Sequence, residues 1–517
     1  MNRTEQTTDI KQDLINELNK RVEDKILEQS NADLLIKLIK NADDSAEALA
    51  IAALGTTYKR TGLHFDKRLE KMTNDIHYFK KNEKLSFHTD DAKPVNKLII
   101  GDNFQALQNL LIQYKGKINV IYIDPPYGKD SMGEFAKTNY NNSLTRDNLL
   151  SMLYPRLHLA KQLLSDDGVI FCSIDDKNQA YVKCLFDEVF GDGNFEGDIH
   201  WRRRNNQPND KTKLIGIVAE HILCYSKDLE KHKLSGVGKI DITGNFSNPD
   251  NDPKGEWASK PWKTGSDQSG TRYKITSPTG KIFDEEWMGD ENTFNSLLRD
   301  GRILFTKNGD GLPRKKYYKS EREEEGQCAS NWWNFEQFGC NQDATTELES
   351  IFDVKAIFSN PKPVKLISSL ISLGAISNNS IILDFFAGSG TTGQAVLDLN
   401  KKDGGNRTFI LCQMNEVTDT TPNGIAYDVT SKRLKRVMTG SCYDGTNDFD
   451  WLKKNEPYGG NLDVYEIASV ANFETTQGKT PFDVIDETLY GKEKFSSVQE
   501  KIDWVCSNFE KTQKEVK

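Results

Sequence analysis

The residues best suited to chemistry are Asp124, Pro125, Pro126 and Tyr127, which directly follow an apolar, β-branched run at 118–123. The run is short and continuous, so it predicts a buried strand. Two prolines cannot continue a central strand, so the four residues should lie at its carboxyl end, where open α/β sheets bind ligands. Asp124 and the Pro125 carbonyl accept hydrogen bonds, and Tyr127 offers a flat ring for stacking. The group therefore suits a planar base that carries an exocyclic amine.

A second stretch, at 381–392, has the pattern of a buried strand, a tight turn of small residues and a helix that begins near Thr391. A ligand against this strand end needs backbone without Cβ atoms, which Gly388 and Gly390 provide. The helix amino terminus favours a carboxylate, and Asp384 can accept from an ammonium. S-adenosylmethionine carries both groups. We therefore expect a cofactor site formed by Asp384, Phe386, Ala387, Gly388, Ser389 and Gly390.

A third acidic position follows the next predicted strand, at 408–413. Glu416 lies 26 positions after Gly390, near the distance at which a second-strand carboxylate binds ribose hydroxyls. The glycine spacing matches neither the dinucleotide pattern G-x-G-x-x-G nor a Walker loop. We expect Glu416 to belong to the cofactor site.

The elements that must position these residues alternate between strand and helix. Strands are expected at 98–100, 118–123 and 169–174, with helices at 104–111, 149–164 and 180–190. Such alternation requires a mostly parallel sheet with helices on both faces. The predicted fold class is α/β, a Rossmann-like doubly wound sheet.

Asp-Pro-Pro-Tyr at 124–127 and Phe-x-Gly-x-Gly at 386–390 together resemble the motifs of DNA amino-methyltransferases that use S-adenosylmethionine. The base-binding motif comes first, a basic insert second and the cofactor motif third, an order that resembles the β group. Within it, the chain looks like the modification (Mod) subunits of type III restriction-modification systems, from about residue 57 to residue 467. The likeness includes Leu-Ile-Ile-Gly-Asp-Asn at 98–103 and Asn-Pro-Lys-Pro at 360–363.

This resemblance implies a class I methyltransferase fold with permuted order and further site residues. It places Asp102 against the cofactor's adenine, although the same carboxylate can simply cap the following helix. It also places Lys362 among the cofactor-binding residues. No residue is assigned to a metal.

Shifts in composition divide the chain into five expected regions. These are a helical N-terminal region (1–56), the catalytic half of the methyltransferase core (57–196), an inserted α+β target-recognition domain (197–350), the cofactor half of the core (351–445), and a C-terminal region for dimerisation or partner docking (446–517). The insert interleaves cations with aromatics and amides, as at 201–207 and 312–319, which favours contact with DNA.

The bulk composition is that of a soluble globular protein. Of 517 residues, 36% are hydrophobic and 28% charged, and the polar start of the chain is no signal peptide. No apolar run has membrane-spanning length. The eight cysteines include no C-x-x-C pair, which indicates reduced thiols in a cytoplasmic protein without structural zinc. The net charge of −9 argues against indiscriminate polyanion binding but allows a local basic groove.

These features lead to one functional expectation with three alternatives. We expect methyl transfer to the N6 amine of adenine in double-stranded DNA, with the base flipped out and stacked on Tyr127. The segment 128–142, rich in Gly and Asn, is placed to close over that base. The alternatives are methylation of cytosine N4, where Ser more often replaces the first Asp, a DNA-specificity or assembly subunit, and methylation of RNA. Expected partners are a second copy of the chain and a restriction (helicase and endonuclease) subunit.

Overall fold

The structure is a computed structural model with two compact units, 1–65 and 66–517. No helix in the described part of the chain is long and apolar enough to cross a membrane. The described residues are 3–23, 27, 29–54, 75–127, 145–209, 211–212, 214–235, 245–325, 328–375, 377–471 and 480–514. The segment expected to close over the base, 128–142, lies outside them.

The first unit is a small helical bundle formed by α1 (Arg3–Glu23), α2 (Gln29–Asn41) and α3 (Ser45–Leu54). Apolar residues recur at helical spacing in all three, so each helix has a face to bury. Those faces pack on one another around a core of Ile15, Leu18, Ile39, Ala42, Ala48 and Ala52. The helices predicted within 11–53 are therefore present, and they have a core of their own.

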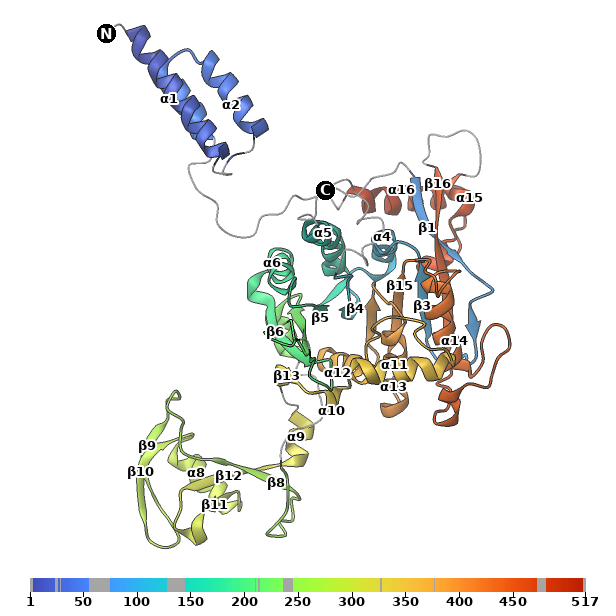
Figure 1. Ribbon diagram of the computed structural model, residues 1–517. Coiled ribbons are helices and arrows are strands. Elements are labelled where there is room, and N and C mark those ends of the chain that lie inside the picture. Colours follow the sequence, from blue (N-terminus) through green and yellow to red (C-terminus); the bar gives the residue numbers. More distant parts are fainter. Residues whose placement is uncertain are drawn as a thin grey trace. The chain divides into compact units, whose positions relative to one another are not determined.

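The second unit is built on one large mixed sheet (Figure 1). Neighbouring strands from β16 to β5 run parallel, whereas β1, β2 and β7 join their neighbours antiparallel. The strand order is β1 (Asp75–Lys81), β16 (Asn461–Ala471), β3 (Val95–Ile100), β15 (Thr408–Gln413), β14 (Ile381–Asp384), β4 (Ile118–Ile123), β5 (Leu164–Ile174), β7 (Ala219–Ser226), β6 (Phe195–Arg202) and β13 (Trp332–Trp333), with β2 (Phe87–His88) beside β16. The predicted mostly parallel α/β fold is confirmed.

Helices cover both faces of this sheet (Figure 1). One layer contains α4 (Asn103–Tyr114), α5 (Thr145–Leu163), α6 (Gln179–Phe190) and α16 (Val498–Lys514), and the other contains α11 (Asn341–Phe352), α12 (Val364–Gly374), α13 (Thr391–Asp403) and α14 (Ser431–Thr439). The main apolar core joins the sheet to the second layer through residues such as Val120, Leu370 and Val396. Further short helices of this unit are α7 (Leu229–Ser235), α10 (Phe335–Phe338) and α15 (Pro481–Val484).

A smaller α+β substructure occupies the middle of the chain. It contains β8 (Trp257–Pro261), β9 (Thr271–Thr276), β10 (Ile282–Trp287), α8 (Glu291–Arg299), β11 (Ile303–Phe305), β12 (Pro313–Tyr318) and α9 (Lys319–Glu325). The strands form two small sheets, and Trp262, Ile275, Trp287, Phe294 and Ile303 make a separate core. In β12, Lys316 is buried and pairs with Asp250 and Asp252, so this cation neutralises the chain's own carboxylates.

Two regions that the sequence analysis places outside the methyltransferase core supply strands to the main sheet. The expected insert, 197–350, supplies β7 and most of β6, because buried side chains such as Ile222 and Tyr225 extend the sheet beyond β5. The expected C-terminal region, 446–517, supplies β16, whose Leu462 and Val464 are fully buried between β1 and β3.

Candidate active site

The two predicted motifs meet because their strands are neighbours. β4 and β14 pair in parallel, with Ile121 opposite Leu383, so Asp124 and the glycine turn leave the sheet at the same edge. Two adjoining cavities, of about 220 and 330 Å³, open there. Five residues line both of them: Asp124, Pro126, Phe358, Phe386 and Gly388.

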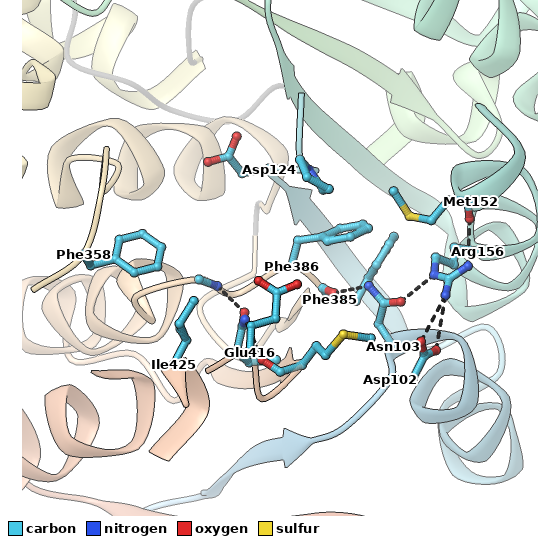
Figure 2. Close-up of a pocket in the computed structure, with 14 residues that line it drawn as sticks. Asp102, Asn103, Asp124, Met152, Arg156, Phe358, Phe385, Phe386, Glu416 and Ile425 are labelled. Atoms are coloured by element: carbon cyan, nitrogen blue, oxygen red, sulfur yellow. Dashed lines mark hydrogen bonds and ion pairs between the residues drawn. The ribbon is translucent and has the colours of Figure 1, made fainter. Parts of the chain in front are cut away.

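The first cavity has apolar walls and acidic ends (Figure 2). Its remaining lining residues are Asp102, Asn103, Met152, Arg156, Phe385, Gln413, Met414, Glu416 and Ile425. Aromatic and thioether walls suit a flat heterocycle, and carboxylates suit hydroxyl or amine donors. This combination fits a nucleoside.

Asp102 is held at the rim of the first cavity by a small polar network. It caps α4 by accepting from the Phe104 N–H at 2.7 Å, and it pairs with the buried Arg156 of α5 at 3.2 Å. Arg156 also donates to Asn103, whose amide in turn donates to the Phe385 carbonyl at 2.7 Å (Figure 2). Asp102 is therefore both a helix cap and a cavity residue, and Arg156 ties the turn after β3 to the turn after β14.

The glycine turn after β14 has backbone geometry that side chains disfavour. Gly388 and Gly390 have φ of +51° and +82°, in the left-handed region. A Cβ on Gly388 would lie 3.1 Å from the Phe358 ring. The Gly388 N–H donates to the Gln413 side chain at 2.6 Å, and Thr430 donates to the Gly388 carbonyl at the same distance. Glycine suits this turn because positive φ is strained for other residues and a Cβ on Gly388 would crowd the Phe358 ring.

A buried arginine supports the turn from behind. Arg433 of α14 donates to the Ser389 hydroxyl at 2.9 Å and to the Thr391 hydroxyl at 2.8 Å. Burial lowers the pKa of Arg433 to about 10, opposed by the charge of Glu347. Arg433 belongs to a run rich in lysine and arginine at 432–436, yet it is buried and serves as an internal hydrogen-bond donor.

Asp384 lines the second cavity, together with Ala387 and Ser389 of the turn, but is only 2% exposed. It accepts from the Phe386 N–H at 3.0 Å and from the Thr392 hydroxyl at 2.5 Å. Burial raises its pKa to about 7, although these two hydrogen bonds oppose the shift. A cation entering the cavity would favour the ionised form.

The second cavity also contains a cluster of charges around Asp124. The Lys362 ammonium lies 2.8 Å from each Asp124 oxygen and 2.7 Å from Glu220. The Tyr127 hydroxyl donates to Asp124, and burial raises the pKa of Tyr127 well above its ordinary value. Arg203 pairs with Glu220 at 3.3 Å. Two carboxylates and two cations thus balance at the edge where Pro125 and Pro126 turn the chain.

Lys362 lies against Asp124 in this structure. It is 8% exposed and is not among the residues that line the first cavity. Burial lowers the pKa of Lys362, but Asp124 and Glu220 raise it by more, so the ammonium stays charged. Its expected contact with the cofactor stays a prediction.

Glu416 faces the first cavity with its carboxylate unpaired. Burial raises its pKa, and within the described residues no hydrogen bond or ion pair involves this side chain. A half-buried acceptor without a partner is suited to hydroxyl donors from a ligand.

Sequence reasoning missed Glu220, Arg203, Arg156 and Phe358 as site residues. Glu220 comes from β7, a strand with no recognisable motif, and Phe358 from the loop before α12. One signal was available, since Arg156 is an arginine between apolar residues inside the predicted helix at 149–164. A charge in that place indicates a buried partner.

Comparisons with known proteins agree with this geometry. The sequence profile of a family described as DNA methylase matches residues 118–418, and a profile of an uncharacterised conserved protein matches residues 10–120. The first match includes both motifs and most of the lining of both cavities.

Named relatives cover most of the chain. It is 31% identical to the Mod subunit of the type III restriction-modification enzyme StyLTI of Salmonella typhimurium strain LT2, over 77% of this chain and 64% of that protein. Its identity to the EcoPI Mod subunit of Escherichia phage P1 is 29%, over 78% of this chain and 70% of that protein. Its identity to the type II methyltransferase M.KpnI of Klebsiella pneumoniae is 31%, over 71% of this chain and 94% of that protein. The chain thus spans just under two thirds of the StyLTI subunit's length.

Among solved structures, the cytosine-N4-specific PvuII DNA methyltransferase aligns with 69% of this chain and 97% of its own. The sequence identity is 13% and the TM-score 0.36.

Proposed function

Because this chain belongs to the DNA methylase family, we propose that it is a site-specific DNA methyltransferase acting on the N6 amine of adenine in double-stranded DNA. The methyl donor in this proposal is S-adenosylmethionine. The observation that carries the proposal is the position of Asp124 and Gly388, which line both adjoining cavities. A donor that extends from the first cavity towards Asp384 and a base that enters the second cavity would meet at Asp124.

The residues present fit S-adenosylmethionine. Phe358, Phe385 and Phe386 supply apolar walls for its adenosine, and the carboxylates of Glu416 and Asp102 supply acceptors. Asp384, with a pKa of about 7, can accept from the ammonium of the methionine moiety, and the glycine turn leaves room beside it. Bound S-adenosylmethionine supplies a methyl group already activated on a sulfonium.

The protein's part in the reaction is positioning and charge. Asp124 and the Pro125 carbonyl accept hydrogen bonds from the target amine, which favours a pyramidal nitrogen whose lone pair faces the donor. Tyr127 stacks on the extruded base, because the amine cannot be reached inside a duplex. The transfer is direct, so no cysteine is needed. This agrees with the burial of Cys172 and Cys412 beneath the site.

We further propose that the chain is the modification subunit of a type III system, working with a separate restriction subunit. Support comes from the StyLTI and EcoPI relatives, which are named Mod subunits of type III enzymes. The acidic first residue of the Asp-Pro-Pro-Tyr motif favours adenine over cytosine.

The test is methylation of unmodified genomic DNA by the purified chain with S-adenosylmethionine, followed by mass spectrometry of the nucleosides. N6-methyladenine is expected, and N4-methylcytosine would overturn the choice of base. Modification-sensitive sequencing of the same DNA would give the recognised site. Absence of any methylated nucleoside would overturn the proposal.

A further inference from the structure

In the structure, Lys362 occupies the oxygens of Asp124 that the target amine would need. Oδ1 accepts from both the Lys362 ammonium and the Tyr127 hydroxyl, and Oδ2 accepts from the same ammonium at 2.8 Å. Each carboxylate oxygen has two lone pairs, so one remains free on Oδ2. An amine can therefore be accepted by Asp124 only beside the ammonium, unless the ammonium moves away.

A cation in this place also works against the expected reaction. Methyl transfer from a sulfonium leaves positive charge on the accepting nitrogen, and like charges repel strongly where water is scarce. Lys362 is nine-tenths buried and lies between two prolines, Pro361 and Pro363, which limit the motion of its backbone. The ammonium can leave Asp124 by moving the flexible part of its own side chain.

Glu220 provides the place for that movement. Its carboxylate is 2% exposed and already lies 2.7 Å from the Lys362 ammonium. Its other oxygen pairs with Arg203, so Glu220 stays in position whether or not it also binds the ammonium. The burial of both partners makes a neutral replacement of either costly.

We propose, resting on the methyltransferase function above, that Lys362 holds the acceptor oxygens of Asp124 until the target amine arrives, and that Glu220 is the positioning residue that then takes the ammonium. Without a base, the Asp124 carboxylate stays hydrogen-bonded to the Lys362 ammonium. When the base enters, the ammonium moves to Glu220, so Asp124 is freed and no charge moves into solvent. Glu220 acts through Lys362, although it also accepts from the Tyr127 hydroxyl at 3.3 Å, and it touches neither the donor nor the base.

The test is a double-mutant cycle on Glu220→Gln and Lys362→Met. Single-turnover methyl transfer is measured with labelled S-adenosylmethionine and a duplex carrying the site found by sequencing. Glu220→Gln should slow transfer at least about tenfold, because the ammonium then stays on Asp124. DNA affinity, measured by filter binding, should change less than about twofold, since it depends mainly on phosphate contacts.

The decisive result is the coupling between the two positions. With Lys362→Met already present, Glu220→Gln should slow transfer by less than about threefold, because that chain has no Lys362 ammonium for Glu220 to bind. An equal loss in both backgrounds, or no loss in the wild-type background, would overturn the inference. Wild-type chain that transfers no methyl group would instead overturn the proposed function, so the two failures are distinct.

Glu487→Gln is the matched control, because Glu487 is also buried and pairs with a lysine, Lys501, at 2.9 Å, but outside both cavities. It should leave the transfer rate unchanged. If Glu220→Gln does not fold, Glu220→Asp replaces it in the cycle. That variant keeps the charge but withdraws it by one methylene, and the same coupling is expected.

Discussion

Asp384 shows at the residue scale how burial prepares a carboxyl group for a cationic ligand. Its pKa of about 7 is raised mainly by desolvation, against the opposing hydrogen bonds from Thr392 and Phe386. A carboxyl group with a raised pKa adds stability below its unfolded value and loses that contribution as pH rises through the folded value. Asp384 therefore weakens the ligand-free fold near neutral pH.

Asp384→Asn should remove this dependence. The free energy of unfolding of the wild-type chain relative to Asp384→Asn should fall by about 3 kcal/mol from about pH 5 to pH 8, at 1.36 kcal/mol per pKa unit. Urea unfolding of both proteins at each pH measures the difference. A difference that stays constant with pH would show that Asp384 is ionised throughout.

In the proposed mechanism, the chemistry depends on Asp124. Asp124→Ala should reduce methyl transfer by at least about a thousandfold, because the amine loses its acceptor. Glu220 still holds the Lys362 ammonium in that variant, so the site should stay folded. DNA affinity by filter binding should be retained, and substantial residual transfer would contradict the assignment.

The residues of the site differ in how far the sequence could predict them. Asp124 to Tyr127 and the turn at 386–390 are contiguous motifs, so residue type and spacing alone indicated their chemistry. Glu220 and Arg156 act through contacts with segments distant along the chain, Lys362 and Asp102 respectively. No local pattern encodes such a pairing, and only the sheet order brings these partners together.

At the scale of elements, the turn after β14 depends on glycine for both conformation and space. Gly388→Val should weaken binding of S-adenosylmethionine about tenfold or more, because positive φ is strained for a β-branched residue and its Cβ meets Phe358. Titration calorimetry measures the affinity.

Gly116→Val is the control for that prediction. Gly116 also has positive φ, of +69°, but nothing lies within 4 Å of the position of its Cβ. It should lower the unfolding temperature and leave the affinity for S-adenosylmethionine intact. An equal loss of affinity in both variants would show that strain alone explains the effect at Gly388.

The strands were predictable where they are apolar and continuous. β4, β14 and β15 follow from short apolar runs, and the structure has them at 118–123, 381–384 and 408–413. β6 was not predicted, because Gly197 and the adjoining arginine and asparagine residues obscure its short alternation of polar and apolar residues. Its place in the sheet depends on pairing with β7, which is a tertiary contact.

At the scale of the whole molecule, the N-terminal bundle has its own core and forms a separate compact unit. A chain that begins at Asp66 should bind S-adenosylmethionine with affinity within about twofold of the full chain, because both cavities are lined from the second unit. Calorimetry on the two proteins tests this. A large loss of affinity would show that the bundle supports the site, and sedimentation of both proteins would show whether it mediates self-association.

The position of β16 has a consequence for folding during synthesis of the chain. This strand, from residues 461–471, fills the gap between β1 and β3, which come from the first hundred residues. Until β16 has been synthesised, the edge of β3 that it pairs with is open. An unpaired strand edge promotes aggregation between chains. Completion of the sheet must therefore wait until residues 461–471 have been synthesised, long after β1 and β3.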